Sequence, residues 1–578
     1  MQTEAIINVS LVDVTAKNDS TPSITGNASF ANVSLLKNEI NNVNNYMTLE
    51  WNYSLLDGTM QHFSDDKDAA GYPVFSSDMS DETGEYESSH DFTAEFTSPH
   101  SSAGISFSFQ GDFPAEIDVE WYGQDNQLLA EKSFYPDQKD YFCEYKVENY
   151  YKVSASFIGS KTPYRFLKMQ NIEYGYELIF TGADLIEAKV LEEVDPISSE
   201  LRINTLDFTV YDEDREFNIL NQKGKYSLFQ SRQEIRAREI VNGETVEMGT
   251  FYLDGKESRS ETEISFHAID GVGIIDKSKF IKGRIYQNEK VSVIVSEIMD
   301  SAGWEKYEIS NELQNLTLSG YIPICSHREA LQQVAFAIRA IVDCSRTNLI
   351  RIYRQNTSAD IKIRDDRLFI DGEKVSDKEY VSKIEITMHQ YQETTEQSTI
   401  FDGILNAGLN EITFSEPAKD LASSAGAIIE SGVNYAIIQM NETGECTVTG
   451  KVYEDLQSTF IRSAEEVNRN EVENVVSVTD ATLVNKNNSY LLAESLFDYY
   501  SLRRTLNARY LLESERTGRW ISVKSYYGMY INGGIETQEI DLAGGFLATA
   551  TITGYNTLEH DYIYTGTEAY TGEEIGVV

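Results

Sequence analysis

Cysteine, histidine, proline and basic residues are scarce in this 578-residue sequence, and each shortage argues against a class of protein. Four cysteines occur without a CxxC pair and seven histidines without an HExxH or HxH pattern, which disfavours a zinc site or a disulfide framework. We expect buried free thiols at Cys143, Cys325, Cys344 and Cys446. Nine prolines are too few for a Pro-rich disordered chain. No apolar run approaches the roughly 20 residues of a membrane-spanning helix, and the first residues lack the basic and apolar regions of a secretory signal.

Positive charge is the largest deficit. There are 48 Lys and Arg against 93 Asp and Glu, a formal net charge of −45. Binding to a nucleic-acid backbone is disfavoured, because phosphate contacts need clustered Lys and Arg. DNA passing near such a surface would be repelled, and the excess of acids would also keep a large assembly component soluble.

Motifs that would indicate catalysis are also missing. There is no G-x-S-x-G nucleophile elbow and no G-x-x-x-x-G-K-[ST] phosphate loop. Gly271-Val-Gly273 lacks the third glycine of a dinucleotide fingerprint, so we interpret it as a turn. Carboxylate pairs for glycoside hydrolysis cannot be singled out among 93 acids. We predict no enzyme activity, no cofactor and no metal site.

Aromatic residues, by contrast, are plentiful, with 35 tyrosines and 26 phenylalanines, which favours a mainly β, multidomain protein that is α+β overall. The length predicts about three to five domains. Residues 1–175 alternate apolar and polar side chains in short runs such as 117–122 and 151–157, as half-buried strands do. We predict a β-sandwich of jelly-roll type over 1–175.

The next strands predict a first small β-barrel over 176–285. Its hairpin turns are expected at Asn242-Gly243 and Asp254-Gly255, because these dipeptides are strong hairpin signals. A helix-containing α/β middle domain follows over 286–380, with its first helix at Lys290–Ala302.

A second helix of the middle domain is predicted at Ser326–Val342. Ser326 and Glu329 have the spacing of a capping box. Apolar residues continue at helical spacing as far as Ile341 and Val342. A strand with one wet face should then carry Arg351 and Arg354.

Strands dominate the remaining sequence. We predict a second barrel region over 381–400 and 456–560, which includes a helix at 490–502. Residues 401–455 are expected to form a small inserted β unit, and 561–578 a flexible tail.

Several of these stretches resemble a known family. The helix at 290–304, the Ala-Leu-Gln-Gln helix with the following Asp-Cys-Ser-Arg, and residues 195–226 and 474–519 are similar to the central hub proteins of phage tails and phage-derived bacteriocins (tailocins). Residues 150–157 and 164–174 resemble the closing strands of galactose-binding-like carbohydrate modules. The resemblance implies a hub body of two small β-barrels, preceded by a carbohydrate-module-like sandwich.

The same resemblance implies a structural role in a phage tail tip or baseplate. Such hubs form homotrimers whose two barrels per chain make a pseudo-sixfold ring, which joins the tail tube to a spike, a fibre or other baseplate parts such as the distal tail protein. The chain would be a virion or tail-like-particle protein, assembled in the bacterial cytoplasm and released on lysis. Two alternatives remain: a receptor-binding (glycan-binding) baseplate protein or adhesin, and a cell-wall hydrolase.

Two groups of residues are candidates for binding. Trp51, Trp121 and Tyr122 offer aromatic faces on which sugars of a cell-surface glycan could stack, although rings in alternating strands more often fill a core. The acidic loop at 64–68 is interpreted as a solvated loop rather than a calcium site. Arg346, Arg351 and Arg354 form a rare basic strip, which we expect to face an acidic neighbour or a subunit contact.

Overall fold

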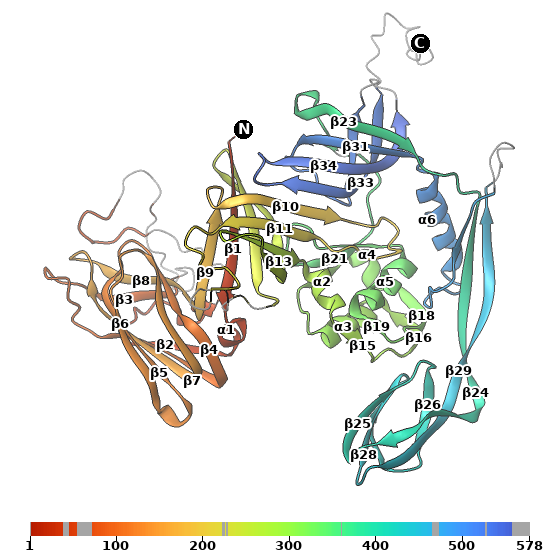
Figure 1. Ribbon diagram of the computed structural model, residues 1–578, viewed down its shortest axis with the longest axis horizontal. Helices are drawn as coiled ribbons and strands as arrows, with labels where there is room; N and C mark the ends of the chain where they lie inside the picture. The colour runs from red at the N-terminus through yellow and green to blue at the C-terminus, as the bar shows by residue number, and fades with distance from the viewer. Residues whose placement is uncertain are drawn as a thin grey trace, which may run out of the picture. The chain divides into compact units, whose positions relative to one another are not determined.

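The computed structural model describes residues 2–37, 46–54, 60, 72–221, 226, 229, 231–359, 361–464, 473–525 and 529–557. The chain is mainly β and multidomain, as predicted (Figure 1). It forms two compact units. The larger unit comprises Met1–Ile7, Phe180–Gly224 and Glu234–Val578, and the sandwich unit comprises Asn8–Ile179 with Lys225–Gln233.

The sandwich unit is built on a seven-stranded antiparallel sheet in the order β3-β8-β4-β7-β5-β6, with β2 paired to β4. The strands are β2 (Thr21–Ile24), β3 (Val74–Met79), β4 (His90–Phe109), β5 (Pro114–Tyr122), β6 (Leu128–Phe134), β7 (Asp140–Ser160) and β8 (Phe166–Glu173). Helix α1 (Val14–Asp19) and the 3₁₀ turns η1 (Val33–Lys37) and η3 (Gln124–Asn126) accompany them.

The two long strands of the sandwich unit, β4 and β7, bend where their ladder shifts register between Glu95 and Gly104. Bulges of this kind increase the bend and twist of a sheet. The inward residues of β4, β5 and β7 enclose an aromatic core that includes Phe92, Phe107 and Phe157. The alternating runs at 117–122 and 151–157 lie in β5 and β7, so the prediction of strands there is confirmed.

The larger unit contains most of a 13-stranded sheet, in the order β23-β31-β34-β33-β10-β11-β14-β13-β12-β1-β9, with β32 joining β33 to β22. The first half comprises β1 (Thr3–Val12), β9 (Gly175–Thr181), β10 (Leu185–Glu193), β11 (Thr205–Tyr211), β12 (Glu234–Val241), β13 (Glu244–Ser258) and β14 (Glu263–Ile269). The second half comprises β22 (Ile361–Lys362), β23 (Leu368–Asp377), β31 (Arg504–Leu511), β32 (Trp520–Lys524), β33 (Tyr530–Asp541) and β34 (Leu547–Thr557); the turn η5 (Asp365–Arg367) precedes β23.

Antiparallel pairing of β10 with β33 joins the two halves, from Lys189↔Asp541 to Glu193↔Thr537. The sequence analysis placed the first residues of the chain in the sandwich, but β1 is a strand of this large sheet, between β12 and β9. Residues 13–174 are thus inserted between two neighbouring strands.

Two dipeptides singled out in the sequence have different roles here. Asn242-Gly243 forms the turn between β12 and β13, as predicted. The prediction of a turn at Asp254-Gly255 was wrong, because β13 continues through both residues and the ladder to β14 has a register shift there. Gly255 therefore belongs to a bulge.

The middle of the larger unit packs helices against short strands. The strands are β15 (Lys279–Phe280), β16 (Ile285–Lys290), β17 (Tyr307–Ile309), β18 (Thr317–Tyr321), β19 (Cys325–Ser326), β20 (Ile341–Asp343) and β21 (Ile350–Tyr353). The helices are α2 (Gly271–Asp276), α3 (Val291–Ala302), α4 (Asn311–Gln314), α5 (His327–Ile338) and α6 (Ser489–Ser501). The buried faces of α3, α5 and α6 share one core.

Two sequence predictions for this region need correction. The helix predicted to reach Val342 ends at Ile338, because Arg339 has a left-handed φ of 60° and the next two apolar residues belong to β20. Gly271-Val-Gly273 is not a turn. It begins helix α2, and the Asp270 side chain accepts a hydrogen bond from the Gly273 N–H at 3.0 Å.

A long two-stranded arm extends the larger unit, formed by β24 (Lys383–Leu405) and β29 (Gly444–Ser463). Strands β25 (Gly408–Thr413), β26 (Ala418–Ser423), β27 (Ala427–Ser431) and β28 (Tyr435–Met440) lie between them in sequence and pack around a small core of their own (Figure 1). Strand β30 (Val475–Val478) pairs with the start of β24. These strands include the predicted insertion at 401–455, but the arm begins earlier.

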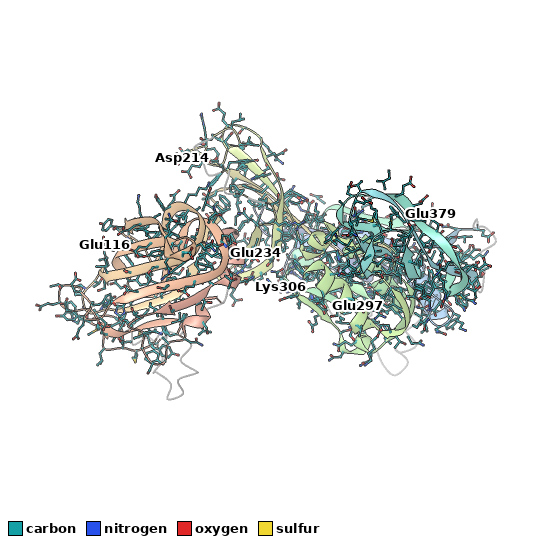
Figure 2. The ribbon with its side chains drawn as sticks, turned by 90° about the horizontal axis from the view of Figure 1, so that it is seen from below. Glu116, Asp214, Glu234, Glu297, Lys306 and Glu379 are labelled. Carbon is teal, nitrogen blue, oxygen red and sulfur yellow. The ribbon has the colours of Figure 1, made fainter. Side chains whose placement is uncertain are left out.

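All four cysteines are free thiols, and Cys143, Cys344 and Cys446 are buried whereas Cys325 is partly exposed. Within the described residues, no helix is long and apolar enough to cross a membrane. Acidic side chains lie on the surface, and Figure 2 shows Asp214 and Glu379 directed away from the ribbon.

Candidate functional site

An arginine-lined cavity in the larger unit lies between β21 and the loop that precedes β32. Its volume is about 420 Å³. On β21, Ile350 and Ile352 point into the core, so the alternating residues Arg351 and Tyr353 face the cavity. The lining residues are Glu308, Ser310, Asp343, Arg351, Ile352, Tyr353, Arg354, Asn356, Arg516, Thr517, Gly518, Arg519 and Trp520.

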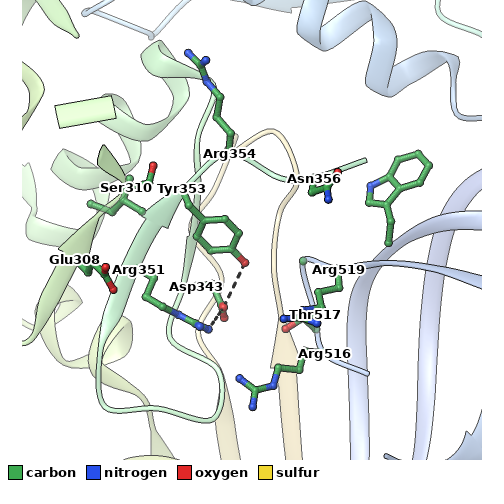
Figure 3. A pocket seen from close by; sticks show the side chains of 13 residues that line it. Glu308, Ser310, Asp343, Arg351, Tyr353, Arg354, Asn356, Arg516, Thr517 and Arg519 are labelled. Atoms are coloured by element: carbon green, nitrogen blue, oxygen red, sulfur yellow. Dashed lines mark hydrogen bonds and ion pairs between the residues drawn. The ribbon is translucent and has the colours of Figure 1, made fainter. Parts of the chain in front are cut away.

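Arginines face the cavity from both sides. Figure 3 shows Arg351 and Arg354 on one side and Arg516 and Arg519 on the other. Arg351 forms an ion pair with Asp343, and the Tyr353 hydroxyl donates to the same carboxylate at 3.5 Å.

The other three arginines, Arg354, Arg516 and Arg519, form no ion pair among the described residues. Burial and the charges of Arg346 and Arg351 lower the pKa of Arg516. The cavity is therefore suited to an anion.

A buried ionic network lies on the β10 side of the same region. Arg346 donates to both carboxylate oxygens of Glu192 at 2.7 and 3.3 Å, and to the main-chain oxygen of Glu515 at 2.7 Å. The Glu515 carboxylate accepts from Arg367 at 2.7 Å. The side chains of Arg346 and Glu192 are 2% and 1% exposed. This network connects the middle of the unit to both halves of the large sheet.

The basic strip predicted from the sequence is divided by the fold. Arg346 is buried and paired with Glu192 inside the molecule, so its prediction as a partner contact was wrong. Arg351 is partly exposed and paired with Asp343, whereas Arg354 is exposed at the cavity. Arg516 and Arg519 were not predicted from the sequence. Two arginines on either side of a glycine, in a chain with so few basic residues, could have indicated a basic loop.

In the sandwich unit, the three predicted aromatic residues lie in different environments. Trp121 is 1% exposed in the core, so it offers no face to a sugar and its prediction as a glycan contact was wrong. Tyr122 is partly exposed and donates to Glu120 at 2.5 Å, which raises its pKa to about 12. Trp51 is 65% exposed in the turn that follows residue 50.

The turn that carries Trp51 is fastened to the start of β8. The buried Glu50 carboxylate accepts from the Phe166 N–H at 3.0 Å and pairs with the buried ammonium of Lys168. Tyr164, 37% exposed, and Arg165 immediately precede Phe166. An exposed indole, a second aromatic ring and a guanidinium are thus presented by two connected loops. Tyr164 and Arg165 were not predicted.

No family model and no curated protein matches this chain. Solved structures of tail proteins are similar to it. The 43 kDa tail protein of prophage MuSo2 from Shewanella oneidensis is 11% identical, with a TM-score of 0.39, over 65% of this chain and 95% of that protein. The tail protein from Neisseria meningitidis MC58 is 9% identical, with a TM-score of 0.39, over 64% of this chain and 92% of that protein.

A carbohydrate-binding structure is also similar to part of the chain. The family 32 module of NanJ from C. perfringens, solved in complex with galactose, is 8% identical over 29% of this chain and 97% of the module, with a TM-score of 0.18. Tail proteins and carbohydrate-binding modules are the two groups that the sequence was found to resemble.

The described residues contain no group of three or more His, Cys, Asp or Glu side chains that could hold a metal ion. The acidic loop at 64–68 and the predicted tail at 561–578 lie outside the described residues. Buried histidines have structural partners. His389 contacts the Asp455 carboxylate at 2.7 Å, and His327 contacts the Ser301 hydroxyl at 3.0 Å.

Proposed function

We propose that this chain is a structural hub of a phage tail tip or tail-like particle, joining the tail tube to a spike, fibre or other baseplate part. The observation that carries the proposal is the antiparallel β10–β33 pairing, which joins groups of seven and six strands side by side in one chain. Three such chains around an axis would present six β units. A sixfold tube could then meet a threefold spike.

Surface charge and the buried polar groups support the same role. A net charge of −45 would let DNA pass without binding. The buried ionic cluster around Arg346 and Glu192 connects parts of the fold, which is a structural role. The proposed partners are tail-tube, spike or fibre and distal tail proteins, with the chain itself as a homotrimer.

The test is assembly of the purified chain. Mass photometry and negative-stain imaging, alone and with the tail-tube protein of the same particle, are expected to show trimers with a sixfold-like ring. A chain that stays monomeric and forms no ring, alone or with the tube protein, would contradict the hub function.

Glycan binding by the sandwich unit is a second candidate, favoured by the exposure of Trp51 on a turn held by Glu50. Aromatic faces of this kind stack on sugar rings. On a glycan array, the wild-type chain should bind at least one glycan, and Trp51→Ala should weaken that binding at least about tenfold. Leu49→Ala is the matched control, because Leu49 is 96% exposed in the same segment but has no aromatic face. A blank array would leave the sandwich unit a structural role only.

A further inference from the structure

We infer that the arginine-lined cavity is a socket for an acidic segment of a second copy of this chain. The inference rests on the proposed hub function, since it names a contact through which copies would assemble. Four arginines line the cavity against two carboxylates, Glu308 and Asp343, and Asp343 is already paired with Arg351. Four arginines around one cavity are an unusual concentration of positive charge in a chain of net charge −45.

Buried donors without acceptors point to a missing ligand at the same place. Thr517 is 1% exposed and Trp520 6% exposed, and both line the cavity. Within the part of the chain that the structure describes, the Thr517 hydroxyl and the Trp520 indole N–H have no hydrogen-bond partner, and neither has Nε of Arg351. Buried polar groups are usually hydrogen-bonded, so these three donors at one cavity are left for an acceptor that the described residues do not supply.

The chemistry of these donors selects carboxylates. Guanidinium groups present planar forks of N–H donors that match a carboxylate bidentately, and a hydroxyl and an indole N–H can add neutral donors beside them. Two of the unpaired arginines, Arg354 and Arg519, are exposed and can reach an arriving side chain. The volume of about 420 Å³ accommodates a few side chains of a peptide segment.

A second copy is the occupant that charge complementarity favours. Each chain carries 93 acidic residues, and some of them are adjacent and exposed, such as Glu213 and Asp214 after β11 (Figure 2). Copies with the same large negative charge repel one another at a distance, so a stable contact needs local positive charge. The arginine socket supplies it.

Charge reversal at the exposed arginines tests the socket in the full-length chain. Arg354→Glu/Arg519→Glu should weaken self-association at least about tenfold in sedimentation velocity at low salt, with an unchanged far-UV spectrum and melting temperature. The matched control is Arg215→Glu/Arg259→Glu, which changes net charge equally at arginines that are 57% and 50% exposed outside the cavity. Equal weakening by both double variants would overturn the inference.

Photocrosslinking identifies the occupant directly. A benzoylphenylalanine placed at Asn356, which is exposed and lines the cavity, should crosslink to an acid-rich peptide of a second copy, as shown by mixing isotope-labelled and unlabelled chains. Crosslinks only within one chain, or none, would overturn the inference. A third result would also overturn the inference: inorganic phosphate binds the wild-type chain with a dissociation constant below about 100 μM, and neither double variant changes assembly. If rings form but do not depend on the socket, the hub function stands and the inference fails. If no oligomer forms at all, both fail.

Discussion

At the scale of single residues, Arg346 carries a positive charge inside the larger unit, where only neighbouring protein groups can compensate it. Its guanidinium is 2% exposed and shares three hydrogen bonds with Glu192 and the main chain of Glu515. Removing one partner of a buried ion pair leaves the other charge without compensation, which is more costly than removing both.

Arg346→Met is expected to lower the free energy of unfolding of the larger unit by about 3–5 kcal/mol, measured by urea denaturation. Arg346→Met/Glu192→Met should recover most of that loss, because no unpaired charge remains. The comparison is Arg202→Met, which removes an exposed ion pair. The side chains of Arg202 and Glu200 are 46% and 52% exposed. This change should lower the free energy of unfolding by less than about 1 kcal/mol. Similar losses at Arg346 and Arg202 would show that the buried pair is not a significant source of stability.

A second residue links stability to pH. Glu239 on β12 is 0% exposed, and burial with the nearby charges of Glu4 and Asp541 raises its pKa to about 8. The unfolded chain releases this proton above about pH 4.3, whereas the folded chain keeps it to about pH 8. The stability of the wild type should therefore fall as pH rises between these values.

Glu239→Gln stays neutral at every pH, so it should gain stability relative to the wild type as pH rises, by at least about 3 kcal/mol between pH 4 and pH 8. Urea denaturation at several pH values measures this. Glu257→Gln, at a side chain that is 70% exposed, should show no such pH dependence. A constant difference for Glu239→Gln across the pH range would contradict a raised pKa.

Some residue environments were readable from the sequence and others were not. Trp121 follows Ile117 and Val119 at every second position, and all three are buried. The alternation therefore indicated that Trp121 faces the core. Arg346 meets a carboxylate 154 residues away, and Arg351 shares a cavity with Arg516 from a distant loop. Contacts of that separation depend on strand order, which local patterns do not determine.

At the scale of elements, helix α5 starts from a complete capping box. Ser326 accepts from the Glu329 N–H at 3.1 Å, and the Glu329 carboxylate accepts from the Ser326 N–H at 2.8 Å. The sequence predicted both bonds because they involve residues only three apart. The end of the helix was predicted four residues too late, because Ile341 and Val342 are buried in a strand and continue the apolar pattern by coincidence.

Ser326→Ala removes one of the two capping bonds and is expected to lower the free energy of unfolding by about 1 kcal/mol in urea denaturation. Ser310→Ala is the matched control, since Ser310 occupies the same position before α4 but makes no side-chain capping bond. Its replacement should change stability by less than half as much. Equal effects at both serines would mean that the capping box contributes little to α5.

At the scale of the whole molecule, the order of strands was the least predictable feature. Alternating patterns identified the strands of both units, but each pattern is compatible with many partners. Strands β1 and β9 are neighbours in the sheet although about 160 residues separate them in sequence. Only this pairing shows that the sandwich is an insertion. Without it, the sequence analysis predicted that the sandwich begins at residue 1.

The insertion makes a prediction about autonomy. Asp13 donates its N–H to the Tyr174 carbonyl at 3.0 Å, so the two ends of the inserted segment meet. Replacing Asp13–Tyr174 by Asn-Gly, a dipeptide suited to a two-residue hairpin, should leave a larger unit that still folds cooperatively and still assembles. The excised segment Asp13–Tyr174 should fold alone, because the buried residues of its main core, from Ala16 to Tyr174, all lie within it.

Thermal melting followed by circular dichroism measures both parts against the full chain, whose transitions should match those of the two pieces. The control deletion extends through Thr181 and so also removes β9, which leaves β1 paired only with β12. That variant should melt at a lower temperature, because the backbone groups of β1 that bonded to β9 lose their partners. If the shorter deletion is as damaged as the longer one, the sandwich unit is required for the larger unit to fold. An independently folding insertion would then be the wrong description of it.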